Sequence, residues 1–175
     1  AVAGAMMDEI SCVTGVRHFV VFGSCGSLNQ EATAGKIIVP TESYRDEGFS
    51  YHFAKASDYI QMENSAKLAV ILEKSGIAYV TGRNWTTDAI YRETERNVAR
   101  RKADGCISVE MESAGLQALC NHRDLELYTF FFASDLVDGS TWQNVNLGTE
   151  EEKKEQINCF EIALKIVSEI TFVEA

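Results

Sequence analysis

The sequence of 175 residues contains few histidines, a single proline and fewer basic than acidic residues. The three histidines, His18, His52 and His122, are widely separated, so a histidine-based metal site is not expected. Pro40 is the only proline, and no linker rich in Pro, Gly or Ser interrupts the chain, so we expect one domain spanning 1–175. Sixteen Lys and Arg against 26 Asp and Glu argue against nucleic-acid and anionic-membrane partners, because both require a basic surface.

Long apolar runs are also missing. The longest, 19–22 and 128–133, are much shorter than the roughly 20 residues that span a bilayer, so no membrane partner is expected. The segment 1–7 has neither an initiating methionine nor the basic start of a signal peptide, and we expect that other residues precede it. The five cysteines form no Cys-x-x-Cys pair, which predicts free thiols and a cytoplasmic location: Cys12, Cys25, Cys106, Cys120 and Cys159.

The hydrophobic pattern predicts strands that alternate with helices. Short apolar runs predict strands at 18–23, 36–40, 78–82 and 127–133, and helical periodicity predicts helices at 2–13, 62–75, 93–102, 112–121 and 150–170. The strands lack alternating polarity, which is typical of a mainly parallel sheet buried on both faces in an α/β fold. Ligands bind such sheets at the carboxyl ends of the strands, so functional residues are expected there.

The last predicted helix has a start signal and an apolar face. Thr149 precedes Glu152 by three residues, which is the spacing of a capping box. Apolar residues recur on one face of this helix, as in an amphipathic helix: Ile157, Phe160, Leu164 and Val167.

Two strand ends carry residues that suit ligand binding. The turn from Gly23 to Gly26 contains two hydroxyl or thiol side chains, and its N–H groups are suited to face an anion or a sugar; alternatively, the glycines only let the chain leave the sheet. Asp135 follows an apolar strand and is a candidate proton donor. Its alternative role is to cap a turn through Asp138 and Gly139.

Two further segments could border a nucleoside-like ligand. Glu110 and Glu112 flank a methionine where a buried segment, 106–109, turns into a helix, and such carboxylates are suited to accept hydrogen bonds from the vicinal hydroxyls of a ribose. The alternative is that both are solvated surface acids. Trp85 and Tyr91 could rim a heterocyclic base, although packing is the more common role of such aromatics.

Taken in order, these motifs resemble the nucleoside phosphorylase and nucleosidase family, which includes purine nucleoside phosphorylases, uridine phosphorylases and methylthioadenosine nucleosidases. The motifs that carry the resemblance are Gly23-Ser-Cys-Gly26, Pro40-Thr-Glu, Arg45-Asp-Glu-Gly48, Thr86-Thr-Asp88 with Tyr91, Val109-Glu-Met-Glu112 and Ser134-Asp135. The resemblance implies a three-layer α/β/α fold with a central mixed, mainly parallel, partly barrel-like sheet. It also implies a homo-oligomer (dimer, trimer or hexamer), and a family N-terminal portion that this chain lacks.

The resemblance assigns a role to each motif residue. Asp135 would protonate N7 of a purine, and Ser134 would orient it. Ser24 would help to hold phosphate, while Met111 and Glu112 would bind the ribose. The base would be bordered by Cys25, Gly26, Ile90, Tyr91 and Val109. No cofactor is implied beyond inorganic phosphate as co-substrate.

The implied reaction is phosphorolysis of a purine ribonucleoside to the free base and ribose 1-phosphate. The alternatives are a hydrolytic nucleosidase, a uridine phosphorylase and a non-catalytic storage or binding protein. Uridine-specific members read the uracil edge with a Gln and an Arg; Thr94 stands in place of the Gln, although Arg96 matches the Arg. Val21 replaces an arginine that phosphorylases of this family carry, and Arg45 and Arg83 are candidate replacements. The arginine that often follows the Ser-Asp pair has no counterpart.

Overall fold

The computed structural model describes residues 1–137 and 141–173, and its centre is a single mixed sheet. The strands of this sheet lie in the order β3-β2-β4-β5-β1-β6-β7. Their bounds are β1 (His18–Ser27), β2 (Ile37–Asp46), β3 (Tyr59–Gln61), β4 (Tyr79–Thr87), β5 (Cys106–Glu110), β6 (Glu126–Val137) and β7 (Trp142–Asn144).

The sheet curves until its two halves meet. The long pairings, β1 with β6 and β2 with β4, are parallel, as is the pairing of β4 with β5. The pairings of β1 with β5, β2 with β3 and β6 with β7 are short and antiparallel. An additional antiparallel pairing of Ile38 in β2 with Phe131 in β6 closes the strands into a barrel-like arrangement. The predicted α/β fold with a mixed, partly barrel-like sheet is therefore confirmed.

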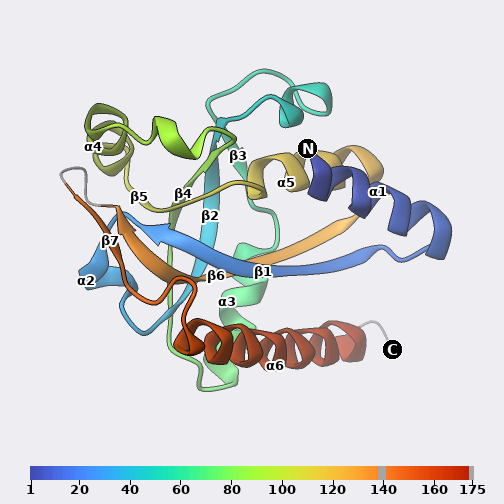
Figure 1. The fold of residues 1–175 in the computed structure, drawn as a ribbon. Coiled ribbons are helices and arrows are strands. Elements are labelled where there is room, and N and C mark those ends of the chain that lie inside the picture. Colours follow the sequence, from blue (N-terminus) through green and yellow to red (C-terminus); the bar gives the residue numbers. More distant parts are fainter. Residues whose placement is uncertain (138–140, 174–175) are drawn as a thin grey trace.

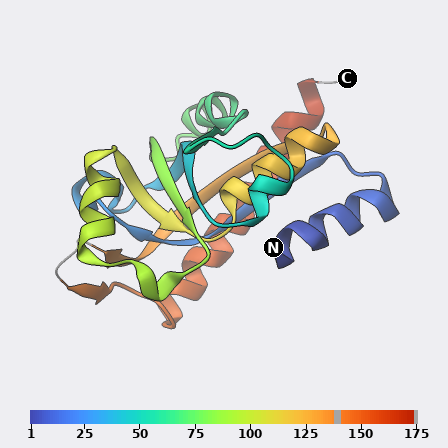
Figure 2. The ribbon, with the colours of Figure 1, turned by 90° about the horizontal axis from the view of Figure 1, so that it is seen from above.

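Helices cover the sheet on two sides (Figure 1). The α-helices are α1 (Val2–Thr14), α2 (Gln30–Thr33), α3 (Ser65–Lys74), α4 (Glu95–Ala103), α5 (Ser113–Arg123) and α6 (Glu150–Val173), and 3₁₀ turns lie at η1 (Phe49–His52) and η2 (Ile90–Arg92). In Figure 1, α3 and α6 lie below the sheet, whereas α1 and α5 lie above it. Figure 2 shows α4 at the opposite end of the molecule from α1.

The strand β6 divides the core because its side chains alternate between the two helical layers. Tyr128, Phe130 and Phe132 pack with buried residues of α3 and α6. Leu127 packs with α5 and α1 on the other side. Since both faces of the strand are covered, its residues 127–133 are apolar apart from Thr129, in line with the predicted buried strand.

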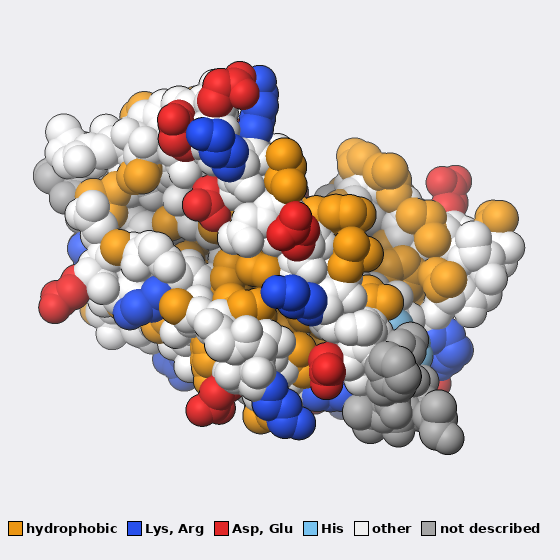
Figure 3. All heavy atoms as spheres, turned by 90° about the horizontal axis from the view of Figure 1, so that it is seen from below, with side chains coloured by type: hydrophobic (Ala, Val, Ile, Leu, Met, Phe, Trp, Pro, Cys, Tyr) orange, Lys and Arg blue, Asp and Glu red, His pale blue; other side chains and the backbone are white. Residues whose placement is uncertain are grey.

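The helix α6 forms as predicted, but its opposite face packs against the sheet. Ile157, Phe160, Leu164 and Val167 are about half exposed, and apolar side chains are visible on the face of the molecule seen in Figure 3. The buried residues of α6 form a second apolar stripe: Cys159, Ile162, Ala163, Ile166 and Ile170. The predicted capping box is half formed: Glu152 N donates to Thr149 Oγ1 (3.3 Å), but the Glu152 carboxylate accepts from Gly148 N (2.5 Å).

Several strands extend beyond the predicted ends. β2 continues past Pro40 after a shift of its register with β4, and β1 and β4 also run further than predicted. The five cysteines carry free thiols, as expected. Within residues 1–137 and 141–173, no helix has the length and apolar character needed to cross a membrane.

Candidate active site

A cleft of about 740 Å³ opens where β1, β5 and β6 end. The strand ends are adjacent because Gly26 of β1 pairs with Val109 of β5 and, after a register shift, with Asp135 of β6. The cleft is lined by all ten residues to which the sequence assigned a site role: Ser24, Cys25, Gly26, Ile90, Tyr91, Val109, Met111, Glu112, Ser134 and Asp135. Segments distant in the sequence thus meet at the predicted sheet edge, and the individual roles stay predictions.

Gly26 allows the walls of the cleft to approach one another closely. A Cβ atom at this position would lie 2.9 Å from Val109 Cγ1, 2.9 Å from Val137 Cγ2 and 3.4 Å from Asp135 Oδ2. The first two distances are too short for carbon atoms in contact, so a side chain here would displace the neighbouring strands. Residues 23–26 lie within β1, so the predicted glycine turn is wrong, and Gly26 has a steric role instead.

Replacing Gly26 by Ala is expected to lower the free energy of unfolding by about 1–3 kcal/mol, because an added methyl group overpacks a site already in contact. Urea unfolding of the variant measures the loss. Gly23 provides the control, since a Cβ atom there meets nothing within 4 Å. A Gly26→Ala protein as stable as Gly23→Ala would contradict this assignment.

Both carboxylate oxygens of Asp135 accept hydrogen bonds. Ser134 Oγ donates to Oδ1 (3.0 Å) and Trp142 Nε1 donates to Oδ2 (2.8 Å). The two donors fix the plane of the carboxyl group at the wall of the cleft. Trp142 was not predicted, since it reaches Asp135 only through the pairing of β7 with β6. Asp138 and Gly139, the alternative capping partners, lie outside the described residues.

The two glutamates around Met111 have different surroundings. Glu110 is buried and accepts from Thr86 Oγ1 (2.5 Å), Asn84 Nδ2 (2.7 Å) and the backbone N–H groups of Glu112 (2.7 Å) and Ser113 (2.8 Å). Burial raises the pKa of Glu110, and these hydrogen bonds oppose that rise. Its carboxylate fixes the start of α5.

Glu112 stands at the N-cap of α5, but its side chain makes no capping hydrogen bond and is exposed at the cleft. The bend from β5 into α5 thus separates the two carboxylates. Within residues 1–137 and 141–173, the Glu112 carboxylate accepts no hydrogen bond, whereas both oxygens of Glu110 accept hydrogen bonds from the protein. Of the pair, Glu112 is the one available to a ligand.

Glu93 is a further carboxyl group in the cleft that the sequence did not single out. It follows η2, lines the cleft with Ile90 and Tyr91, and is partly buried. Burial, together with the negative charge of Asp135, raises the pKa of Glu93 to about 7. Its position could not be read from the sequence, because the segment that carries it is irregular.

The cationic residues considered for phosphate lie elsewhere. Arg45 is buried and donates to Ser50, Ser57 and the carbonyl of Lys55. Arg83 bonds Glu42 and the carbonyl of Asp104. Neither lines the cleft, whose described wall contains no Lys or Arg but five carboxyl groups: Glu93, Glu95, Glu110, Glu112 and Asp135. Val21 packs beneath α1 and α5.

The two aromatic residues considered for contact with a base, Trp85 and Tyr91, have different surroundings. Trp85 is buried in the core and donates from Nε1 to Asp46 Oδ2 (3.0 Å), so its role is packing. Tyr91 is 96% exposed at the rim of the cleft. Thr94 and Arg96 stand where uridine-specific members carry the Gln and Arg that contact uracil. Neither lines the described wall of the cleft, since Thr94 caps α4 and Arg96 lies within that helix.

Cys25 lines the cleft as a neutral thiol. Burial, reinforced by the negative charges of Glu110 and Asp135, raises the pKa of Cys25 well above its usual value. A thiolate is therefore not available as a nucleophile. The side chain instead packs with Ile38 and Phe131.

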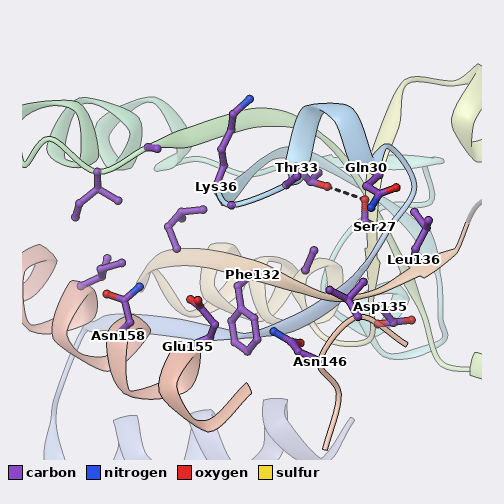
Figure 4. Close-up of a pocket in the computed structure, with 18 of the residues that line it drawn as sticks. Ser27, Gln30, Thr33, Lys36, Phe132, Asp135, Leu136, Asn146, Glu155 and Asn158 are labelled. Carbon is purple, nitrogen blue, oxygen red and sulfur yellow. Dashed lines mark hydrogen bonds between the residues drawn. The ribbon is translucent and has the colours of Figure 1, made fainter. Parts of the chain in front are cut away.

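A second cavity of about 460 Å³ lies between α2, the end of β6 and α6 (Figure 4). Ser27 and Thr33 form a hydrogen bond at its rim (2.7 Å). Asp135 is the one residue with a predicted role that also borders this cavity. The predicted residues therefore converge on the larger cleft, which is the candidate active site.

Comparisons with known proteins agree with the motifs and the fold. The family model of the phosphorylase superfamily matches residues 1–171. A DeoD-type purine nucleoside phosphorylase of Caldanaerobacter subterraneus subsp. tengcongensis is 26% identical over 164 residues, covering 91% of this chain and 68% of the relative. One from Hahella chejuensis is 28% identical over 159 residues, covering 86% of this chain and 63% of the relative.

A solved structure has a similar fold. The AMP nucleosidase of Bacteroides thetaiotaomicron VPI-5482 superposes with a TM-score of 0.69 at 20% identity, covering 97% of this chain and 68% of that one. With the family match over nearly the whole chain, the chain belongs to the phosphorylase superfamily of nucleoside phosphorylases and nucleosidases.

Proposed function

We propose that the protein cleaves the N-glycosidic bond of a purine ribonucleoside. The observation that carries this proposal is the arrangement of Asp135, held by Ser134 and Trp142, in one cleft with Met111 and the unpaired Glu112. The DeoD-type relatives are named as purine nucleoside phosphorylases, which supports a purine substrate.

In the proposed mechanism, a protonated Asp135 donates its proton to N7 as the bond to the base breaks. Negative charge develops on the departing purine, and a positioned acid neutralises it in the transition state. Glu112 accepts hydrogen bonds from the two ribose hydroxyls, and Met111 lies under the sugar. Ser134 keeps the carboxyl group of Asp135 aimed at the base.

The proposed nucleophile is inorganic phosphate, held in part by Ser24, in line with the names of the DeoD-type relatives. Hydrolysis is the second candidate. It is favoured by the five carboxyl groups and the lack of Lys and Arg along the described wall, because phosphate binds where cations offset its charge. The same charge opposes a nucleotide substrate, so we propose an uncharged nucleoside.

Phosphate dependence separates the two nucleophiles. Inosine, adenosine, methylthioadenosine and uridine are assayed with and without phosphate, with release of base and sugar product measured. We expect purine release that requires phosphate and yields ribose 1-phosphate. Equal rates without phosphate, with free ribose as product, would establish hydrolysis instead, and cleavage of uridine alone would overturn the purine assignment.

The oligomeric state, the cellular location and the co-substrate are also part of this proposal. A homo-oligomer and a cytoplasmic location are predictions, as are the co-substrate phosphate and the lack of any other cofactor. Size-exclusion chromatography with light scattering measures the oligomeric state directly. A fully active monomer would contradict the expected homo-oligomer.

A further inference from the structure

Glu93 is a carboxyl group in the cleft for which the proposed mechanism has no use. It lies on the connection between β4 and α4, where its backbone N–H bonds Ile90 O (3.4 Å). Its side chain makes no hydrogen bond or ion pair with any residue in the described part of the chain, although it is partly buried. A partly buried carboxyl group that the protein leaves unpaired has its acceptor oxygens free for a ligand.

Glu93 is close enough to Asp135 for their charges to interact. The negative charge of Asp135 contributes to the raised pKa of Glu93, after the larger effect of burial. Glu93 directly follows η2, Asp135 lies in β6, and both line the same cleft. A ligand bound in this cleft can therefore contact both carboxyl groups.

The purine edge that includes N7 carries a second polar group. In adenine, N7 is adjacent to the 6-amino group, a hydrogen-bond donor, whereas in hypoxanthine or guanine it is adjacent to the 6-oxo group, an acceptor. A carboxylate accepts from an amino group but faces an oxo group with its lone pairs. The group at position 6 therefore determines whether a purine fits beside Glu93.

We propose that Glu93 reads position 6 of the purine and selects 6-aminopurine ribonucleosides over 6-oxopurine ribonucleosides. This inference rests on the proposed function, since it requires Asp135 to face N7. The carboxylate of Glu93 accepts a hydrogen bond from the 6-amino group. The same carboxylate repels a 6-oxo group, so inosine binds less well than adenosine.

The charge of Glu93 makes this selection depend on pH. Along the described wall of the cleft, the charged groups that surround Glu93 are all acidic. They are Asp135 in β6, Glu110 at the end of β5, Glu112 at the N-cap of α5 and Glu95 at the start of α4. A pKa of about 7 means that Glu93 is mostly ionised at pH 8 and mostly protonated at pH 6. The protonated form can donate to a 6-oxo group, so the selection weakens as the pH falls.

The test compares kcat/KM for adenosine and for inosine between pH 6 and pH 8. Both substrates present N7 to Asp135, so the ratio cancels effects that the two substrates share. At pH 8, wild type is expected to prefer adenosine at least about tenfold, the factor of one hydrogen bond to a charged group. Glu93→Gln, whose amide both donates and accepts, is expected to lose most of this preference and its pH dependence.

Glu63→Gln is the matched control, because Glu63 is exposed and does not line the cleft. This variant is expected to keep the wild-type ratio at each pH. An unchanged ratio in Glu93→Gln, or a wild type that prefers inosine at pH 8, would overturn the proposal.

The same experiment tests the proposed function separately from the role of Glu93. If wild type releases no base from either nucleoside with or without phosphate, the proposed function fails, and equilibrium binding of adenine and hypoxanthine then tests Glu93 alone. Tighter binding of adenine that Glu93→Gln abolishes supports the selection. Equal binding of the two bases by wild type rejects it.

Discussion

Asp135→Asn is expected to lower kcat/KM for purine release by about 10² or more, the lower range for the loss of a general acid. An amide of the same shape still accepts a hydrogen bond from Ser134, but it has no acidic proton to give to N7. The loss therefore arises from the chemistry and not from the space that the side chain fills. Steady-state kinetics with adenosine and inosine measure it.

A substrate with an acidic leaving group separates proton donation from other effects. A 4-nitrophenyl riboside needs no proton on its departing group, so Asp135→Asn is expected to cleave it almost as fast as wild type does. Asp58→Asn serves as the control, because Asp58 is exposed and outside the cleft. Equal losses with nucleoside and nitrophenyl substrate would remove the acid role from Asp135. Undiminished purine release would also reject it.

The residues of the cleft that could be predicted are those next to strong local patterns. Asp135 follows a run of apolar residues, and the glycine-containing segment 23–26 follows another, so both were expected at strand ends. Parallel strands bring their carboxyl ends together, and the parallel pairing of Gly26 with Asp135 does so here. Val109 joins them through a short antiparallel pairing with Gly26. Local pattern and sheet geometry thus explain why these predicted residues line one cleft.

The residues that were missed depend on contacts between distant or irregular segments. Trp142 reaches Asp135 through β7, a strand of three exposed residues that has no apolar pattern. Glu93 follows a short 3₁₀ turn whose direction no local signal sets. The positions of Trp142 and Glu93 depend on tertiary contacts, and such contacts leave no periodic pattern in a single sequence.

The helix α6 illustrates the same limit within a correctly predicted element. Its sequence carries two apolar stripes, one with Phe160 and Leu164 and another with Ile162 and Ile166. Helical periodicity shows that each stripe lies on one face, but it does not show which face meets the sheet. The structure buries the second stripe against β6 residues such as Tyr128 and Phe130.

The two glutamates around Met111 are expected to fail in different ways when changed. Glu110→Ala leaves four donors without a buried acceptor, including Asn84 Nδ2 and Thr86 Oγ1, and also leaves a cavity. We expect the free energy of unfolding to fall by about 3–5 kcal/mol, as for other losses of a buried, fully bonded charge. Urea unfolding monitored by circular dichroism measures this change.

Glu110→Gln tests whether the charge or the volume matters at this position. Its amide retains the size but places a donor where the carboxylate accepts, so about 1–3 kcal/mol should be lost. Glu112→Gln is the matched comparison, since the Glu112 side chain is exposed and makes no capping bond. It should keep the stability of wild type and raise KM for the nucleoside. The opposite result, a destabilised Glu112 variant beside an unaffected Glu110 variant, would show that the ribose contact and the fixing of α5 had been assigned to the wrong carboxylates.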